Sequence, residues 1–257
     1  MKIGITQYSV SPSYIDGQSL VRRVSELGAS GVEPFFAAAD DALFSWSASD
    51  IRQFMAEAEN RGIAVPSTAV GIFNCDSSLV EKTGQTKAVA LIERALEFSA
   101  AVHAHIMLLC TYLQSEPNTT EKKKNLLDTI RRTEPLARKL GIDIALESPL
   151  PAEELVKLVD AADSDHIGIY YDLGNAIALG FDPVEEIAIV SRHLRAVHIK
   201  DSVNKLGGLH LGKGYLNMPA AMDALKKISY DGWLMIETPA DNDDDVRADI
   251  ELVKQFL

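Results

Sequence analysis

Four ionisable side chains each stand at the end of an apolar run, and the four runs follow one another along the chain. They are Glu147, Asp172, His198 and Glu237, separated by 25, 26 and 39 residues. Burying an unpaired charge is costly, so a buried strand gains nothing from such a residue at its end unless something binds there. Three carboxylates held together also raise one another's pKa unless a cation neutralises them. The pattern therefore predicts a site for one divalent metal ion.

The donor set indicates which ions would suit this site. Three carboxylates and one imidazole favour a hard or borderline ion with five or six ligands, which points first to Mn²⁺ and Mg²⁺, with Co²⁺ and Zn²⁺ as alternatives. For any one of these residues alone, a loop carboxylate or a satisfied buried histidine explains the sequence equally well. Four residues in the same register favour the metal site.

Apolar runs typical of strands alternate with amphipathic stretches typical of helices along the whole chain. Strands are predicted at 2–8, 31–36, 63–70, 106–111, 142–147, 167–172, 194–199 and 233–237. Helices are predicted at 20–27, 49–60, 80–101, 119–140, 152–161, 183–191, 219–228 and 244–256. This strict alternation, without a break in composition, predicts an α/β fold, a single (β/α)8 TIM barrel domain over residues 1–257.

Three details of the predicted elements can be checked in the structure. Ser49 is the expected N-cap of the second helix. Pro135 should kink the helix at 119–140 or mark its restart. The segment 202–217 is expected to be a loop, and it accounts for the longest gap between the four site residues.

The active face of such a barrel is formed by residues at the C-terminal ends of the strands. Glu147, Asp172, His198 and Glu237 all fall there, on adjacent strands, so their side chains can converge. His103 and His105 form a His-x-His pair but precede the fourth strand. They are therefore expected at the opposite face, with a structural role.

Composition narrows the range of partners and compartments. The net charge of −12 and the pI near 4.9 disfavour nucleic acid and anionic membrane surfaces. No apolar run approaches the roughly 18 residues of a membrane span. Cys75 and Cys110 show no paired motif, which is typical of reduced thiols in a cytoplasmic protein. The first residues lack the features of a signal peptide.

The chain resembles the xylose isomerase-like barrels, the sugar phosphate isomerase/epimerase family, which also includes ketose 3-epimerases, inosose dehydratase and, more distantly, endonuclease IV. The matching stretches are Ala-Leu-Glu147-Ser-Pro, Tyr-Tyr-Asp172-Leu-Gly-Asn-Ala, Val-His198-Ile-Lys-Asp, Leu-Gly212-Lys-Gly214 and Tyr230-Asp-Gly-Trp-Leu-Met-Ile-Glu237. The resemblance implies a carbohydrate substrate and self-association into a homo-oligomer. It also implies that Glu147 and Glu237 remove and return a proton through an enediolate, next to a carbonyl that the metal polarises.

The substrate-binding positions match the ketose 3-epimerases only in part. Those enzymes carry a His where this chain has Asn175 and an Arg where it has Asn204, whereas Glu153 matches. Asn175 can still bind a substrate hydroxyl. Glu153 is a weaker candidate contact, because acidic residues are in any case favoured in the first turn of a helix.

Three more residues are candidate substrate contacts. Glu33 ends the second predicted strand and can bind a hydroxyl or support a metal ligand. Lys200 and His210 lie close in sequence to Gly212-Lys213-Gly214, whose backbone could form a nest for an anion such as a phosphate. A flexible loop with solvated lysines is the alternative interpretation of that stretch.

Three functions are compatible with these residues. The first is a metal-dependent isomerase or epimerase of a sugar or sugar phosphate. The second is a lyase that dehydrates a keto-polyol of the inosose type with the same metal and glutamates, and the third is a non-catalytic sugar-binding barrel. Phosphodiester hydrolysis of the endonuclease type is disfavoured by the acidic charge.

Overall fold

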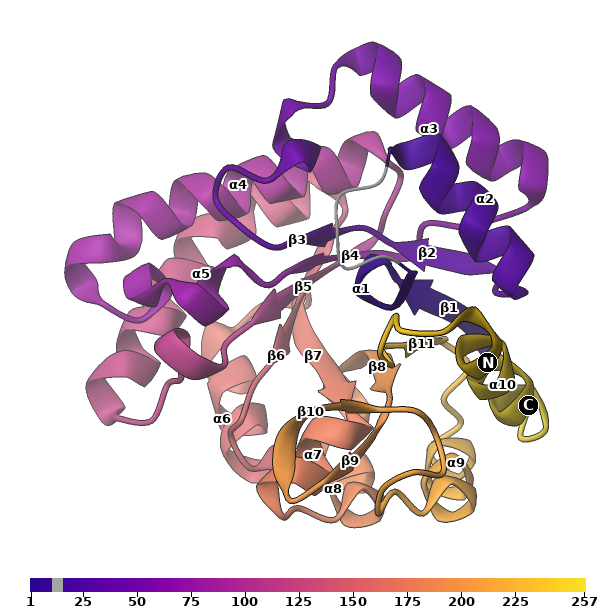
Figure 1. The fold of residues 1–257 in the computed structure, drawn as a ribbon. Helices are drawn as coiled ribbons and strands as arrows, with labels where there is room; N and C mark the ends of the chain where they lie inside the picture. Colours follow the sequence, from indigo (N-terminus) through magenta and orange to yellow (C-terminus); the bar gives the residue numbers. More distant parts are fainter. Residues whose placement is uncertain (11–15) are drawn as a thin grey trace.

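The computed structural model describes residues 1–10 and 16–257. Within these residues, nine strands pair side by side in parallel to form one sheet, in the order β2-β1-β11-β8-β7-β6-β5-β4-β3 (Figure 1). The strands are β1 Lys2–Thr6, β2 Gly31–Glu33, β3 Phe35–Phe36, β4 Ser67–Val70, β5 Ile106–Cys110, β6 Asp143–Glu147, β7 Ile167–Asp172, β8 Leu194–Ile199 and β11 Trp233–Ile236.

The two ends of this sheet are joined by the chain itself at Pro34. β2, which ends just before Pro34, pairs with β1, and β3, which begins just after Pro34, pairs with β4. β2 and β3 are therefore the first and the last strand in the order of the sheet. Proline has no N–H to donate to a ladder and interrupts a strand. The single strand predicted at 31–36 is therefore wrong, and a nearly closed parallel barrel of nine strands replaces the predicted eight.

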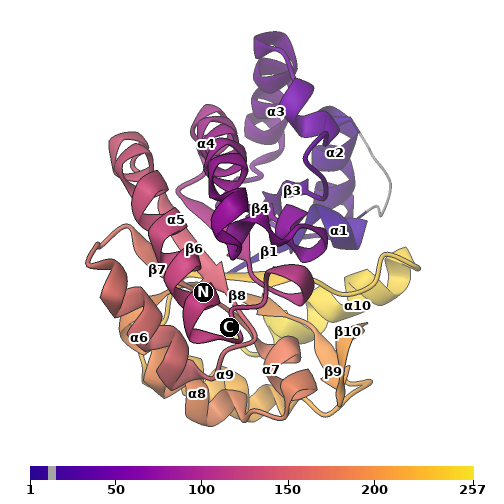
Figure 2. The same ribbon diagram turned by 90° about the vertical axis from the view of Figure 1, so that its left-hand side faces the viewer.

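The longer helices lie around the outside of the sheet (Figures 1 and 2). The α-helices are α1 Gln7–Val10, α2 Gly17–Leu27, α3 Ala48–Arg61, α4 Gln85–Ala101, α5 Thr120–Leu140, α6 Ala152–Ala162, α7 Leu173–Leu179, α8 Pro183–Val190, α9 Met218–Lys227 and α10 Asp243–Lys254. The short helices α1 and α7 directly follow β1 and β7 and were not predicted. Among the described residues, no helix is both long and apolar enough to cross a membrane.

One of the three detailed expectations is corrected, and the other two hold in part. The N-cap of α3 is Ser47 rather than Ser49, because Ser47 and Asp50 cap each other reciprocally through side chain and backbone. α5 continues through Pro135 to Leu140, so the helix does not restart there, and the kink at Pro135 stays a prediction. The segment 202–217 is not all loop, since β9 (Asp201–Val203) and β10 (Lys205–Leu209) form an antiparallel hairpin.

The strands are buried on both faces, as parallel strands in a barrel must be. In β5, Leu108 and Cys110 belong to a small inner cluster with Tyr170, whereas Met107 and Leu109 pack in the large cluster beneath the helices. Side chains alternate along a strand. A residue at a strand end therefore points into the barrel or away from it according to its register.

Candidate metal centre

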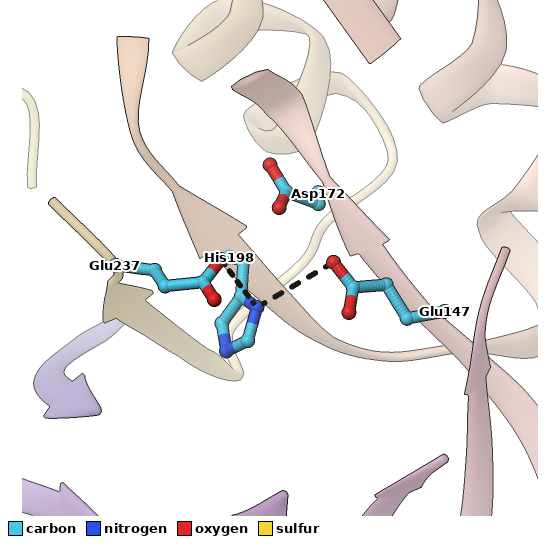
Figure 3. Close-up of side chains that lie close together, drawn as sticks. All are labelled: Glu147, Asp172, His198 and Glu237. Carbon is cyan, nitrogen blue, oxygen red and sulfur yellow. Dashed lines mark ion pairs between the residues drawn. The ribbon is translucent and has the colours of Figure 1, made fainter. Parts of the chain in front are cut away.

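The four residues predicted to bind metal converge at the C-terminal end of the sheet (Figure 3). Glu147, Asp172 and His198 lie in the strands β6, β7 and β8, and Glu237 follows β11 by one residue. Each residue offers one oxygen or nitrogen atom, and these four atoms lie within 4.8 Å of one another. The first three side chains are buried, and Glu237 is the most accessible with 18% of its side chain exposed.

Asp172 is positioned by the start of the unpredicted helix α7. Its Oδ1 accepts hydrogen bonds from the backbone N–H groups of Gly174 at 2.8 Å and Asn175 at 3.0 Å. This is the usual N-cap arrangement, which holds the carboxylate in one orientation. The other oxygen, Oδ2, is left facing the cluster. Burial raises the pKa of Asp172 to about 7, although the neighbouring Lys200 ammonium opposes this shift.

His198 is oriented by Glu33, a residue 165 positions away in the sequence. His198 Nε2–H donates to Glu33 Oε1 at 2.9 Å. The other oxygen of Glu33 accepts from Ser67 Oγ at 2.5 Å and from the Tyr170 hydroxyl at 2.8 Å. Because Nε2 faces Glu33, Nδ1 is the ring nitrogen that faces Glu147 and Glu237. A carboxylate behind a histidine commonly orients a metal-binding imidazole in this way.

Glu147 is held by two donors that sequence reasoning did not connect with it. Cys110 Sγ donates to Oε2 at 3.0 Å, and Asn175 Nδ2 donates to Oε1 at 3.1 Å. Burial acts to raise the pKa of Glu147, but the attraction of its carboxylate to His198 and to the charge of Lys200 lowers the pKa overall. Burial and the charge of Glu147 raise the pKa of the Cys110 thiol well above its usual range, so the thiol remains a donor.

Lys200 Nζ also lies within the cluster. It is 2.7 Å from Asp172 Oδ2 and 2.5 Å from Glu237 Oε2. Burial acts to raise the pKa of Glu237, but the positive charges of Lys200 and His198 together lower it more. The pKa of this carboxyl therefore falls well below its ordinary range.

The arrangement fits a divalent ion. His198 Nδ1 is buried and has no hydrogen-bond partner, and Asp172 Oδ2 is buried with its charge paired by the Lys200 ammonium. His198 Nδ1 lies 3.3 Å from Glu237 Oε2 and 3.7 Å from Glu147 Oε1, which is close enough for an ion pair. An electron pair on Nδ1 facing carboxylates is stable only if a proton or a metal ion lies between them. These four side chains can therefore hold a metal, and oxygen-rich donor sets suit Mn²⁺ and Mg²⁺.

Glu147 and Glu237 approach His198 from opposite sides (Figure 3). This follows from the strand order, in which β7 and β8 separate β6 from β11. Two carboxylates that flank one metal site can contact opposite faces of a small molecule bound there.

The remaining predicted substrate contacts lie in four different places. Asn175 and Lys200 belong to the cluster, and Glu33 lies beneath His198, with 0% exposure. Glu153 is exposed in the first turn of α6. His210 bonds through both ring nitrogens to acids outside the cluster, at Asp241 and Asp249.

The histidine pair and the predicted anion nest are also separate from the cluster. His103 and His105 precede β5, at the end of that strand opposite Cys110. In the 212–214 stretch, Lys213 N–H donates to the His210 carbonyl, and a Cβ on Gly214 would lie 2.3 Å from Asp201 Oδ1. A protein carboxylate therefore packs against this turn.

Sequence reasoning missed two residues beside Glu147, Cys110 and Tyr112. Cys110 is the last residue of β5 and is paired with Glu147 in the sheet register. Tyr112 is buried, and burial followed by the nearby charges of Glu147 and Asp172 raises the pKa of its hydroxyl well above the usual range. The position of Cys110 at a strand end was the available signal.

His210 should make stability depend on pH. Its Nδ1 lies 2.6 Å from Asp249 Oδ2 and its Nε2 lies 2.9 Å from Asp241 Oδ1, so both nitrogens donate and the ring is cationic. Burial lowers the pKa of His210, but the hydrogen bonds to Asp241 and Asp249 raise it more. The stabilisation of the fold by the charged His210 ring is therefore fully present at pH values below about 6.5, the pKa of a histidine in the unfolded chain. It is lost as the pH rises through the higher pKa that His210 has in the folded protein.

We expect His210→Gln to lower the free energy of unfolding by about 1.5–3 kcal/mol at pH 5.5, the usual range for a hydrogen bond to a charged group. Urea unfolding of wild type and variant at pH 5.5 and pH 9 measures this difference in the free energy of unfolding. The difference should be smaller at pH 9. An equal difference at both pH values would contradict a cationic His210 ring.

The chain is similar to curated proteins that are named as a sugar phosphate epimerase and as inosose dehydratases. It is 24% identical over 208 residues to the probable L-ribulose-5-phosphate 3-epimerase UlaE of Mycoplasma pneumoniae, covering 77% of this chain and 68% of that protein. It is 23% identical over 146 residues to the inosose dehydratase of Geobacillus kaustophilus, covering 48% of this chain and 47% of that protein. The matches span only about half the length of most of these curated relatives.

The fold itself is shared with solved structures. The 3-keto-D-glucoside 4-epimerase YcjR of E. coli superposes with a TM-score of 0.81 over 99% of each chain, at 18% sequence identity. At this identity the superposition establishes the fold alone. Residues 21–256 match the sequence pattern of the xylose isomerase-like TIM barrel. This match covers nearly the whole chain and confirms the resemblance seen in its strand-end motifs, so the protein belongs to the xylose isomerase-like TIM barrel family.

Proposed function

We propose that this protein is a metal-dependent isomerase or epimerase acting on a sugar, keto-sugar or sugar phosphate. The observation that carries the proposal is the placement of Glu147 and Glu237 on opposite sides of a cluster able to hold a divalent ion. The epimerases among its relatives and structural neighbours support the same class of reaction.

In this proposal the two glutamates move protons. A divalent ion, for which the oxygen-rich donor set favours Mn²⁺, would polarise the substrate carbonyl and an adjacent hydroxyl. Glu147 removes the proton from the carbon next to the carbonyl, while Cys110 and Asn175 hold its carboxylate in place. Glu237, on the other side, returns a proton, which inverts the carbon if it acts on the opposite face.

The proposal assigns different tasks to the remaining polar side chains. Asn175 and Lys200 lie close enough to the cluster to contact the substrate. Glu33 acts by orienting His198 rather than by touching the substrate. We further propose that residues 1–257 form one domain that works in the cytoplasm as a homo-oligomer.

Solvent deuterium incorporation tests the proposed function. The Mn²⁺-loaded protein is incubated in D₂O with a panel of ketoses and ketose phosphates, and the recovered sugars are analysed by mass spectrometry and NMR. We expect deuterium at the carbon next to the carbonyl of at least one sugar, and none with protein kept in a chelator. Tight sugar binding without exchange would instead identify a sugar-binding barrel.

A dehydratase is the second candidate, and the match to inosose dehydratases favours it specifically. The same first proton transfer would then be followed by loss of a hydroxyl group, with the second glutamate protonating the leaving oxygen. Incubation with inososes separates the two reactions, since elimination gives a product lighter by one water. Exchange into inosose without that product would rule the lyase out for this substrate.

A further inference from the structure

The Lys200 ammonium occupies oxygens that a metal ion in this cluster would need. Nζ lies 2.7 Å from Asp172 Oδ2 and 2.5 Å from Glu237 Oε2, and only 8% of the lysine side chain is exposed. Asp172 and Glu237 are two of the four residues whose donor atoms converge. An ammonium at hydrogen-bond distance from both carboxylates stands where those ligands would meet a metal.

Two glycines leave room for the Lys200 side chain. Lys200 follows β8 directly and passes the first turn of α7, where Gly174 lies against it. A Cβ atom at Gly174 would come within 2.4 Å of Lys200 Cγ and 2.8 Å of its carbonyl oxygen. The helix that Asp172 caps therefore has a glycine where the lysine stem approaches. On the other side, Gly208 of the β9–β10 hairpin lies near Lys200 Cδ.

The negative charge of the clustered carboxylates explains why they need this lysine when no divalent ion neutralises them. Four carboxylates that are largely buried, including Glu33 beneath His198, face one imidazole and one ammonium. Buried like charges are costly unless cations neutralise them. A divalent ion would supply the same neutralisation more strongly, but it would also repel an ammonium held on the same oxygens. The two cations therefore exclude each other from Asp172 and Glu237.

We propose that Lys200 is a resident counter-ion of the metal-free cluster, which a divalent ion displaces from Asp172 and Glu237 toward the mouth of the barrel. The inference rests on the metal site of the proposed function. The flexible four-carbon stem of lysine permits this movement without a change in the backbone. Metal binding then includes the work of moving an ammonium, so the protein binds its metal more weakly than the four ligands alone would.

Removing the ammonium tests this competition. Lys200→Met keeps the length and apolar character of the stem but carries no charge. We expect it to bind Mn²⁺ at least tenfold more tightly by isothermal titration calorimetry, and to melt at a lower temperature than wild type in the presence of a chelator. Lys205→Met, which removes an exposed charge from the nearby strand β10, is the matched control and should change neither value.

Amine labelling reports the displacement itself. Wild-type protein is treated with acetic anhydride with and without saturating Mn²⁺, and modification of each lysine is followed by peptide mass spectrometry. Lys200 should become several times more reactive with Mn²⁺, because its ammonium leaves a buried ion pair, whereas Lys205 should not change.

The outcomes separate this inference from the proposed function. If wild type binds Mn²⁺ and Lys200→Met binds it equally or more weakly, the counter-ion inference fails and the metal site stands. Unchanged labelling of Lys200 on Mn²⁺ binding also overturns the displacement. If neither protein binds any divalent ion, the metal site fails and the inference fails with it.

Discussion

Replacing Glu147 or Glu237 by glutamine should lower turnover by about 10²–10⁴-fold, the contribution expected of a positioned acid or base. Glutamine keeps an oxygen of similar shape for a metal ion but cannot accept a proton. At Glu147 the glutamine oxygen can accept one of the two hydrogen bonds that the carboxylate accepts from Cys110 and Asn175. Metal affinity should therefore fall only modestly in both variants, and steady-state rates at saturating Mn²⁺ should remain low.

Asp172→Asn is the matched control for this prediction. An asparagine oxygen can still cap α7 through the N–H groups of Gly174 and Asn175, so the fold should be preserved. The change removes a carboxylate from the cluster but no proton acceptor from the reaction. Excess Mn²⁺ should therefore restore much of the activity of Asp172→Asn. If it also restores both glutamine variants, neither glutamate is the base and another group must move the proton.

Replacing Glu33 by alanine should weaken metal binding by about 10–100-fold, the usual cost of losing the carboxylate behind a metal-binding histidine. Glu33 accepts a hydrogen bond from His198 Nε2–H, and this contact leaves Nδ1 facing the other predicted ligands. Without this acceptor the ring can turn or take the other tautomer. Titration calorimetry with Mn²⁺ measures the effect independently of turnover.

Two further variants show whether the effect of Glu33 comes from its contact with His198. Glu33→Gln can still accept a hydrogen bond from Nε2, so it should lose less metal affinity than Glu33→Ala. Ser67→Ala removes a donor to the oxygen of Glu33 that does not contact His198. It should bind Mn²⁺ nearly as wild type does. Equal affinity in wild type and Glu33→Ala would show that the imidazole is oriented by something else.

The amino-acid sequence was sufficient to predict the barrel and the four convergent residues, because both depend on short-range regularities. Apolar runs of strand length recur between amphipathic helices, and parallel strands joined by helices present their C-terminal ends at one edge. Glu147, Asp172, His198 and Glu237 each end such a run, so their meeting follows from register alone. Their roles in binding metal and moving protons remain predictions.

Contacts between distant segments were decided by the tertiary structure. Glu33 was a candidate from its position at a strand end, but its bond to His198 depends on the two side chains pointing into the same barrel. Pairing of β6 with β5 brings Cys110 to Glu147. Helix and strand periodicity carries no information about which side chains meet inside a barrel, because packing across the interior sets that.

The direction in which single side chains point could not be predicted from the sequence either. Lys200 and His210 were both predicted to reach a substrate, and the structure separates them: the first lies among the carboxylates of the cluster, and the second bonds to Asp241 and Asp249. Pro34 likewise interrupts a strand that periodicity alone predicts to be continuous. In each case the outcome depends on which charges and hydrogen-bond partners the folded chain brings within a few ångströms, and only the three-dimensional arrangement determines that.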